Sequence, residues 1–201
     1  MTALAAPSLL PAVPEPSRET GWWAMVCVCA TEASLFAVLI TAYFYLAMRS
    51  ATWPPPGIRS PELEIPLAMT VALLSSSGAM AWAERGVARN RRPQLIAGLA
   101  LAIGLGAVFL ALFVHEYHDK LRLVLPHMHA YASMFYVITG IHGAHVSFGL
   151  LLLAFTLLRA VRGHFDAHHR SGVAIVALYW HFVDLVWLVI VATLYLSPRL
   201  T

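Results

Sequence analysis

The residues best suited to chemistry in this sequence are ionisable side chains placed inside long apolar runs. His181 and Asp184 lie three positions apart in the apolar run Val173–Leu196, so they share one face of a helix. His142 and His145 have the same spacing in another apolar run. Ionisable groups are costly to bury at such depth, and they usually face the interior of a helix bundle, where they serve a function.

A single glutamate, Glu32, is the third feature of this kind, and it lies ten residues past Trp22 in the first apolar run. With a helix rise of about 1.5 Å per residue, Glu32, His145 and His181 fall within a few turns of one another in depth. A shared polar cluster costs less than isolated buried charges. We therefore expect Glu32 to share a proton or a hydrogen bond with His142 or His145.

The same residues could serve other chemistry. His142, His145 and His181 could ligate haem or a metal ion, but a metal site needs three or four convergent ligands. His181 and Asp184 could be a ligand and its orienting partner, or they could hydrogen-bond across helices and hold the bundle together. We expect these residues and Glu32 to bind no metal, because their hydrogen-bonding capacity is better used in satisfying one another.

Further polar residues lie at the end of the third apolar run and in the loop that follows. His115 and Glu116 are placed where water can reach them, so a solvated role is expected. His118, His127 and His129 make the loop rich in histidine. A weak copper or zinc site is an alternative for this loop, whereas a solvated surface is the default interpretation.

These residues must be positioned by membrane-spanning helices. Of the 201 residues, 60% are hydrophobic and only 11% are charged, against roughly 25% charged in soluble domains. Five apolar runs each meet the roughly 20 residues that a transmembrane helix needs. They are Trp22–Met48, Pro66–Ala83, Pro93–Val114, Tyr131–Leu158 and Val173–Leu196. The sequence therefore predicts an all-α integral membrane bundle of five transmembrane helices over residues 21–199, preceded by a disordered cytoplasmic tail, residues 1–20.

Charge and cysteine content exclude other classes. The chain carries a net charge of +3, but its basic residues lie in short loops between apolar runs, which is a topology signal and not a nucleic-acid-binding surface. Eight Lys and Arg residues lie on the side of the amino terminus and five on the other, so the positive-inside rule places the amino terminus in the cytoplasm and the carboxyl terminus outside. Cys27 and Cys29 point to different sides of a helix and cannot bridge each other.

Several motifs resemble one known family, subunit III of haem–copper respiratory oxidases of the cytochrome c oxidase type. Residues 179–187 match its carboxyl-terminal signature Tyr-Trp-His-Phe-Val-Asp followed by Val-Trp, and residues 139–146 match its Thr-Gly-x-His-Gly-x-His-Val motif. Glu32 falls where the family keeps a membrane-buried glutamate, and Glu116-Tyr117 matches its Glu-Tyr at an outer helix end. The resemblance runs from about Trp22 to Leu196, and it is closest to short bacterial members with five helices.

The resemblance implies a subunit with no catalytic centre, haem or copper of its own. Such subunits flank the catalytic subunit I, which carries haem and copper, and they associate with subunit II and further respiratory subunits. They bind phospholipid in a cleft between a two-helix group, formed by the first and second helices, and a three-helix group. They also support proton uptake in aerobic respiration, and the membrane is the bacterial plasma membrane.

Two departures from the family pattern bear on that role. Ala174 occupies a position where the family often has glutamate, and Phe113 occupies one that is usually glutamine. Roles that depend on those two side chains are therefore not expected here. Two alternatives stay open, namely an accessory subunit of a nitric-oxide reductase system, and a membrane haem or metal protein that uses His142, His145 and His181.

Overall fold

The computed structural model describes residues 18–55, 63–123, 125–167 and 169–199. Residues 1–17 of the expected disordered tail lie outside this part of the chain. Five α-helices follow one another: α1 (Arg18–Arg49), α2 (Glu64–Ala88), α3 (Arg92–Leu123), α4 (Ala130–Val161) and α5 (Ser171–Ile190). All five are long and apolar enough to cross a membrane, so the predicted all-α membrane bundle is confirmed.

The helices extend beyond the apolar runs that predict them. Helices α1, α3 and α4 have 32 residues each, which corresponds to about 48 Å, whereas the hydrocarbon core of a bilayer is about 30 Å thick. Their extra turns carry polar residues that reach the headgroup region. Helix α5 continues as a π-helical stretch, Val191–Leu196, and a 3₁₀ turn, Ser197–Arg199.

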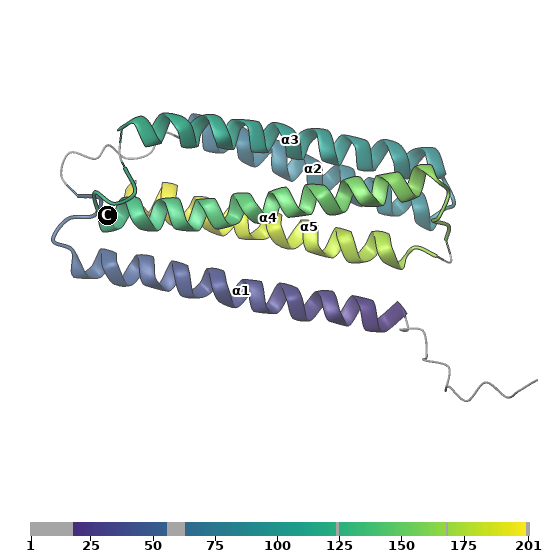
Figure 1. The fold of residues 1–201 in the computed structure, drawn as a ribbon, viewed down its shortest axis with the longest axis horizontal. Helices are drawn as coiled ribbons and strands as arrows, with labels where there is room; N and C mark the ends of the chain where they lie inside the picture. Colours follow the sequence, from purple (N-terminus) through teal and green to yellow (C-terminus); the bar gives the residue numbers. More distant parts are fainter. Residues whose placement is uncertain (1–17, 56–62, 124, 168, 200–201) are drawn as a thin grey trace, which may run out of the picture.

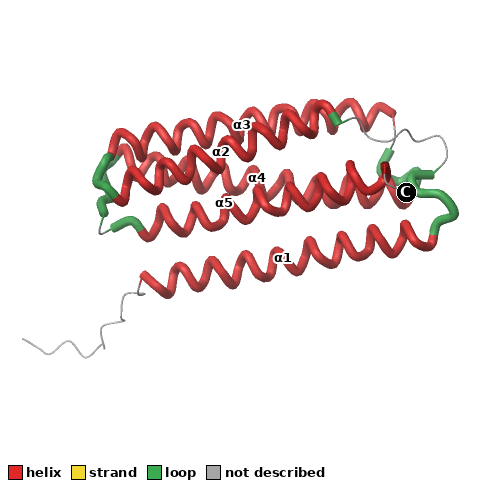
Figure 2. The backbone as a smooth tube through the Cα atoms, turned by 180° about the vertical axis from the view of Figure 1, so that it is seen from behind, coloured by secondary structure: helices red, strands yellow, loops and turns green. Residues whose placement is uncertain are grey.

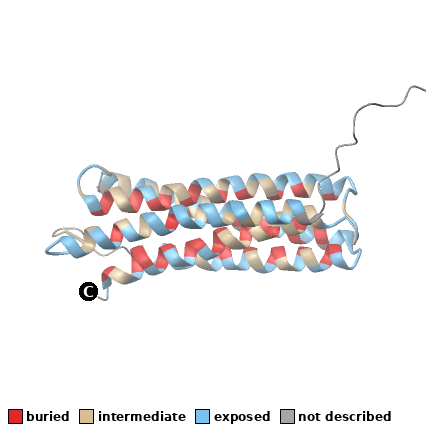
Figure 3. Cartoon of the chain, turned by 90° about the horizontal axis from the view of Figure 1, so that it is seen from below, coloured by how far each residue is buried: buried red, intermediate tan, exposed pale blue. Residues whose placement is uncertain are grey.

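The helices form a four-helix group with α1 at its edge (Figures 1 and 2). Helices α2 and α3 pack most extensively, α4 packs against α3 and α5, and α5 also packs against α2. Helix α1 packs against α5 and α4. The expected pairing of the first two helices is therefore wrong, because α5 packs against both of them while α2 uses its small residues to approach α3. Figure 3 shows the buried residues on the faces that the helices turn toward one another.

Glycine permits the closest approach between α2 and α3. A Cβ atom added at Gly98 would lie 2.8 Å from the Cβ of Ala83 and 2.9 Å from the carbonyl oxygen of Ala79. Backbone atoms cannot move aside as a flexible side chain can, so only glycine fits here. Gly104, two turns further along α3, has no atom within 4 Å of such a Cβ.

Gly98→Ala is therefore expected to lower the free energy of unfolding by about 1–3 kcal/mol, because the added methyl group forces α2 and α3 apart. Gly104→Ala is the matched control, and it should leave stability unchanged or slightly increased through better helix propensity. Thermal unfolding of the purified chain in detergent measures both. Equal melting temperatures for the two variants would show that the α2–α3 contact tolerates the methyl group.

Candidate functional site

The first polar contact in the bundle joins α1 to α4. The His145 Nε2 atom lies 2.9 Å from Oε2 of Glu32. The other ring nitrogen, His145 Nδ1, lies 2.7 Å from the carbonyl oxygen of Ile141, one turn earlier in α4. The side chains of His145 and Glu32 are 17% and 32% exposed, so both are largely covered by protein. The structure thus brings Glu32 to one of the two histidines expected to pair with it.

These two hydrogen bonds determine where the protons of the pair can lie. A carbonyl oxygen only accepts, so Nδ1 of His145 donates to Ile141. When the imidazole is neutral, Nε2 carries a lone pair, and Glu32 must be protonated to donate to it. When the imidazole is charged, Nε2 donates to the Glu32 carboxylate. In both states one proton lies between Nε2 and Oε2 and the pair is neutral overall, so the contact can hold one exchangeable proton within the membrane.

In addition to its packing against α5, two groups of side-chain contacts hold α1 on the bundle. Beside the Glu32–His145 pair, the Phe36 ring lies 5.3 Å from the imidazole of His145. Nearer the end of α1, the buried Tyr43 ring packs 5.3 Å from Trp53 and 6.3 Å from Tyr131. In the most apolar stretch of α1, only 6% of the residues are buried within the chain. The attachment of this helix therefore depends on these contacts together with its packing against α5.

His142 occupies an aromatic environment instead of a polar cluster. It is fully buried, and its ring stacks on Trp187 with 5.2 Å between the ring centres. The Phe109 ring lies nearly perpendicular to it, with 5.9 Å between the ring centres. Neither ring nitrogen has a hydrogen-bond partner among the described residues. The expectation that these polar residues satisfy one another is therefore wrong for His142. The three-residue spacing places His142 and His145 on neighbouring parts of α4, but the polar group of α1, Glu32, bonds only to His145. The contact of α1 with His142 is aromatic, with the Phe36 ring 6.3 Å away.

His181 bonds across helices to α2. Its Nδ1 atom lies 2.5 Å from Oγ of Ser77, and its Nε2 atom lies 3.8 Å from a carboxylate oxygen of Glu84. We call the contact between α2 and α5 that contains these residues the α2–α5 seam. Thr70, Ser77 and Glu84 recur every seven residues on α2, a spacing that keeps them near one helix face. This seven-residue period is present in the sequence, but nothing in it indicates that the face contacts α5.

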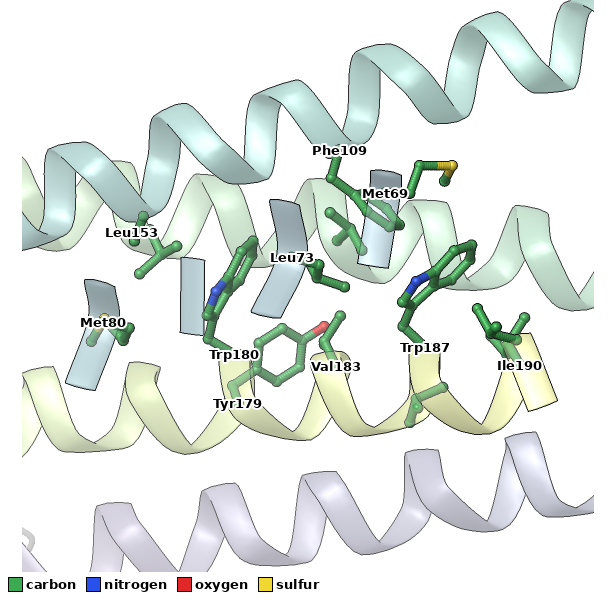
Figure 4. Close-up of a cluster of buried hydrophobic side chains, with 14 of the residues drawn as sticks. Met69, Leu73, Met80, Phe109, Leu153, Tyr179, Trp180, Val183, Trp187 and Ile190 are labelled. Carbon is green, nitrogen blue, oxygen red and sulfur yellow. The ribbon is translucent and has the colours of Figure 1, made fainter. Parts of the chain in front are cut away.

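Two tryptophans of the same signature segment, Trp180 and Trp187, point from α5 into the cluster of buried side chains (Figure 4). Both also bond to α2. Trp180 donates its indole N–H to the hydroxyl of Ser76 at 3.0 Å, and Trp187 donates to the hydroxyl of Thr70 at 3.0 Å. Both indoles are 1% exposed. Gly149 of α4 makes room for Trp180, because an added Cβ would lie 2.8 Å from the indole ring. The α2–α5 seam therefore combines tight aromatic packing with hydroxyl acceptors.

Asp184 lies one turn beyond His181 and is 3% exposed. Neither of its carboxyl oxygens has a hydrogen-bond partner within the described residues. Ser77 and His181 are the neighbouring groups that act on it. The expectation that Asp184 would be satisfied by the other polar residues is therefore also wrong. The spacing of His181 and Asp184 places both on one face of α5, but Ser77 and Glu84 of α2 are taken up by His181.

Glu116 is buried and paired, which corrects the expectation of a solvated role. It is 7% exposed, its Oε1 atom accepts a bond of 2.5 Å from Nζ of Lys120, and the hydroxyl of Tyr195 lies 3.3 Å away. The ammonium group of Lys120 also lies 4.5 Å from the centre of the Phe135 ring. Only the neighbouring His115 is solvated, with 64% of its side chain exposed. Tyr195 comes from the π-helical stretch that follows α5, and no motif or spacing in the sequence indicates that this stretch returns to α3.

The expected single cluster is therefore divided into separate sites. Glu32 and His145 lie between α1 and α4, His181 and Asp184 lie at the α2–α5 seam, and Glu116 lies near the far end of α3. Within the described part of the chain, no group of three or more His, Cys, Asp or Glu residues is arranged to hold a metal ion. The arrangement is suited to holding protons and to joining helices.

Comparisons with known proteins show which family the chain resembles. The family described as "Cytochrome c oxidase subunit III" matches residues 18–198. Cytochrome c oxidase subunit 3 of Struthio camelus is 36% identical over 179 residues, which cover 86% of this chain and 68% of that protein. The corresponding proteins of Gallus gallus and Cyprinus carpio are both 35% identical over the same lengths.

Proposed function

The chain belongs to the cytochrome c oxidase subunit III family, and on that basis we propose that it stabilises the catalytic subunit, binds phospholipid and supports proton uptake. It is a non-catalytic subunit of a haem–copper oxidase. The proposed direct partner is subunit I, which carries haem and copper, with subunit II and further respiratory subunits in the same complex. The proposed location is a bacterial plasma membrane, with the amino terminus in the cytoplasm.

The observation that carries this proposal is the hydrogen bond between Glu32 and His145. It holds one proton inside the membrane and attaches α1, a helix that buries little of its surface in the bundle. Apolar side chains such as Val38 and Met48 are exposed on α1, at 67% and 80%. Such a surface must face lipid or another subunit in the membrane. A loosely packed helix with a proton-holding attachment fits a subunit that covers a catalytic partner and contacts phospholipid.

Purification of the tagged chain from its own membranes in mild detergent tests the proposed partners. We expect a haem- and copper-containing polypeptide to co-purify in fixed ratio, phospholipid to be retained, and the complex to reduce oxygen. Isolation of the chain without a haem protein would contradict the proposal, and a complex that reduces nitric oxide but not oxygen would favour the accessory role.

Protease digestion of sealed vesicles of known orientation tests the topology, because only one end of the chain should be accessible from the cytoplasmic side.

A further inference from the structure

A series of polar side chains along the α2–α5 seam takes no part in the Glu32–His145 pair. Helix α5 begins at Ser171, so His181 lies about 15 Å and Asp184 about 20 Å along the helix from that end. Helix α2 ends at Ala88 beside it, so Glu84 lies about 6 Å and Ser77 about 16 Å from the same end. The polar groups thus reach from the end of the bundle to about half its depth.

The outer end of this series opens into a pocket. Its volume is about 350 Å³, and it is lined by Glu84 and Val87 of α2 and by residues at the start of α5, among them Arg170 and Ser171. A cavity of this size with charged walls accommodates several water molecules. Glu84 is therefore in contact with both the pocket and His181, and it connects the pocket to the interior of the seam.

The inner end of the series is the unpartnered carboxyl group of Asp184. An ionised carboxylate buried without a partner is strongly disfavoured, so Asp184 must hold a proton or face a cation. Glu84 is the acidic group that acts on His181 from α2, and Asp184 is the one on its own helix. His181 is thus the group placed to supply a positive charge or a proton to Asp184.

We propose that Glu84, His181 and Ser77 form a proton-exchange path between the pocket and Asp184. A proton from pocket water binds the Glu84 carboxylate and passes to Nε2 of His181 across a gap of 3.8 Å, a distance that one water molecule can bridge. The imidazolium releases a proton from Nδ1 to the hydroxyl oxygen of Ser77, 2.5 Å away. Ser77 lies near enough to act on the Asp184 carboxyl group. When that group turns to accept a hydrogen bond, the hydroxyl proton of Ser77 passes to the carboxylate, so one proton is transferred and no electrons move.

The chemistry of each group suits its place in this path. Imidazole can accept a proton at one nitrogen and release another from the second. A serine hydroxyl donates and accepts at once, and a carboxylate only accepts. The path lies in a different helix contact from the Glu32–His145 pair, and its operation does not depend on the function of that pair.

Infrared spectroscopy of the full-length chain in lipid nanodiscs tests the path. The carbonyl stretch of protonated carboxyl groups is followed after transfer from H2O to D2O, and the band lost in Asp184→Asn identifies Asp184. We expect this band to shift as deuterium replaces the proton. Glu84→Gln and Ser77→Ala should each slow the shift by about tenfold or more, because a positioned proton-transfer group has been removed.

Glu64→Gln is the matched control, because it removes an exposed carboxyl group from the opposite end of the same helix. It should leave the rate of exchange unchanged. Circular dichroism verifies that each variant keeps its helices. If Glu84→Gln folds poorly, Ser77→Ala still tests the path, because it removes only one hydroxyl group. The proposal is overturned if wild-type protein lacks an Asp184 band that exchanges, or if the folded Glu84 and Ser77 variants exchange as fast as wild type.

Discussion

Trp180→Ala is expected to lower the free energy of unfolding by about 3–5 kcal/mol, which is a large part of the stability of a typical domain. The indole is 1% exposed and lies against Gly106 of α3 and Gly149 of α4, where an added Cβ would come within 2.9 Å and 2.8 Å of the ring. Its N–H bonds to Ser76 of α2. One side chain of α5 thus contacts three neighbouring helices, and its removal leaves a cavity that those rigid backbones cannot close.

Thermal or denaturant unfolding in detergent measures this loss, and Trp82→Ala is the matched control. Trp82 also lies in a helix of the bundle, but it is 42% exposed, so its removal leaves no internal cavity. Trp180→Phe separates packing from hydrogen bonding, because it keeps an aromatic ring and leaves the Ser76 hydroxyl without the indole donor. If the alanine variants of Trp180 and Trp82 lose equal stability, then Trp180 does not hold the four-helix group together.

Glu32→Ala is expected to leave the haem content of the oxidase complex unchanged and to make its activity decay several-fold faster during turnover. The change removes the partner of Nε2 of His145, which costs about 1–3 kcal/mol locally. Since α1 buries little of its surface and this is its polar contact with α4, the loss should increase the population of states in which α1 separates from α4 while it still packs against α5. About 1 kcal/mol corresponds to roughly fivefold. The measurements are the haem spectrum of the purified complex and the half-life of oxygen consumption.

Glu32→Gln separates the hydrogen bond from the proton. The side-chain amide of this variant could still donate to His145, but it cannot carry the exchangeable proton of the pair. If oxygen consumption by the Glu32→Gln complex lasts nearly as long as in wild type, the role of the residue is the attachment of α1. If it decays as fast as in Glu32→Ala, the role is proton transfer. A hydrophobic carbodiimide, which modifies protonated carboxyl groups in apolar surroundings, should label Glu32 in wild type. Both roles would be contradicted if the Glu32→Ala complex consumes oxygen for as long as wild type and the carbodiimide labels other carboxyl groups before Glu32.

The class of the protein follows from its amino-acid sequence alone. Five apolar runs can be satisfied only as membrane-spanning helices, because a backbone in hydrocarbon must make its hydrogen bonds within the segment. Depth along each helix also follows from sequence, since the rise per residue is constant. This is why Glu32 and His145, on different helices, could be expected to meet. The helix ends were predicted less well, because polar turns continue a helix beyond its apolar run, as at the carboxyl-terminal end of α3.

The choice of neighbouring helices, and the direction in which each polar group faces, depend on the packing of the whole bundle. Helical period places His142 and His145 near one another on α4, yet Glu32 of α1 bonds to His145 while aromatic rings from α1, α3 and α5 surround His142. In the same way, His181 finds Ser77 on α2, whereas Asp184 finds no hydrogen-bond partner in the described chain. Lateral packing depends on the fit of whole helix surfaces and on small residues such as Gly98, which no periodicity in a single helix specifies.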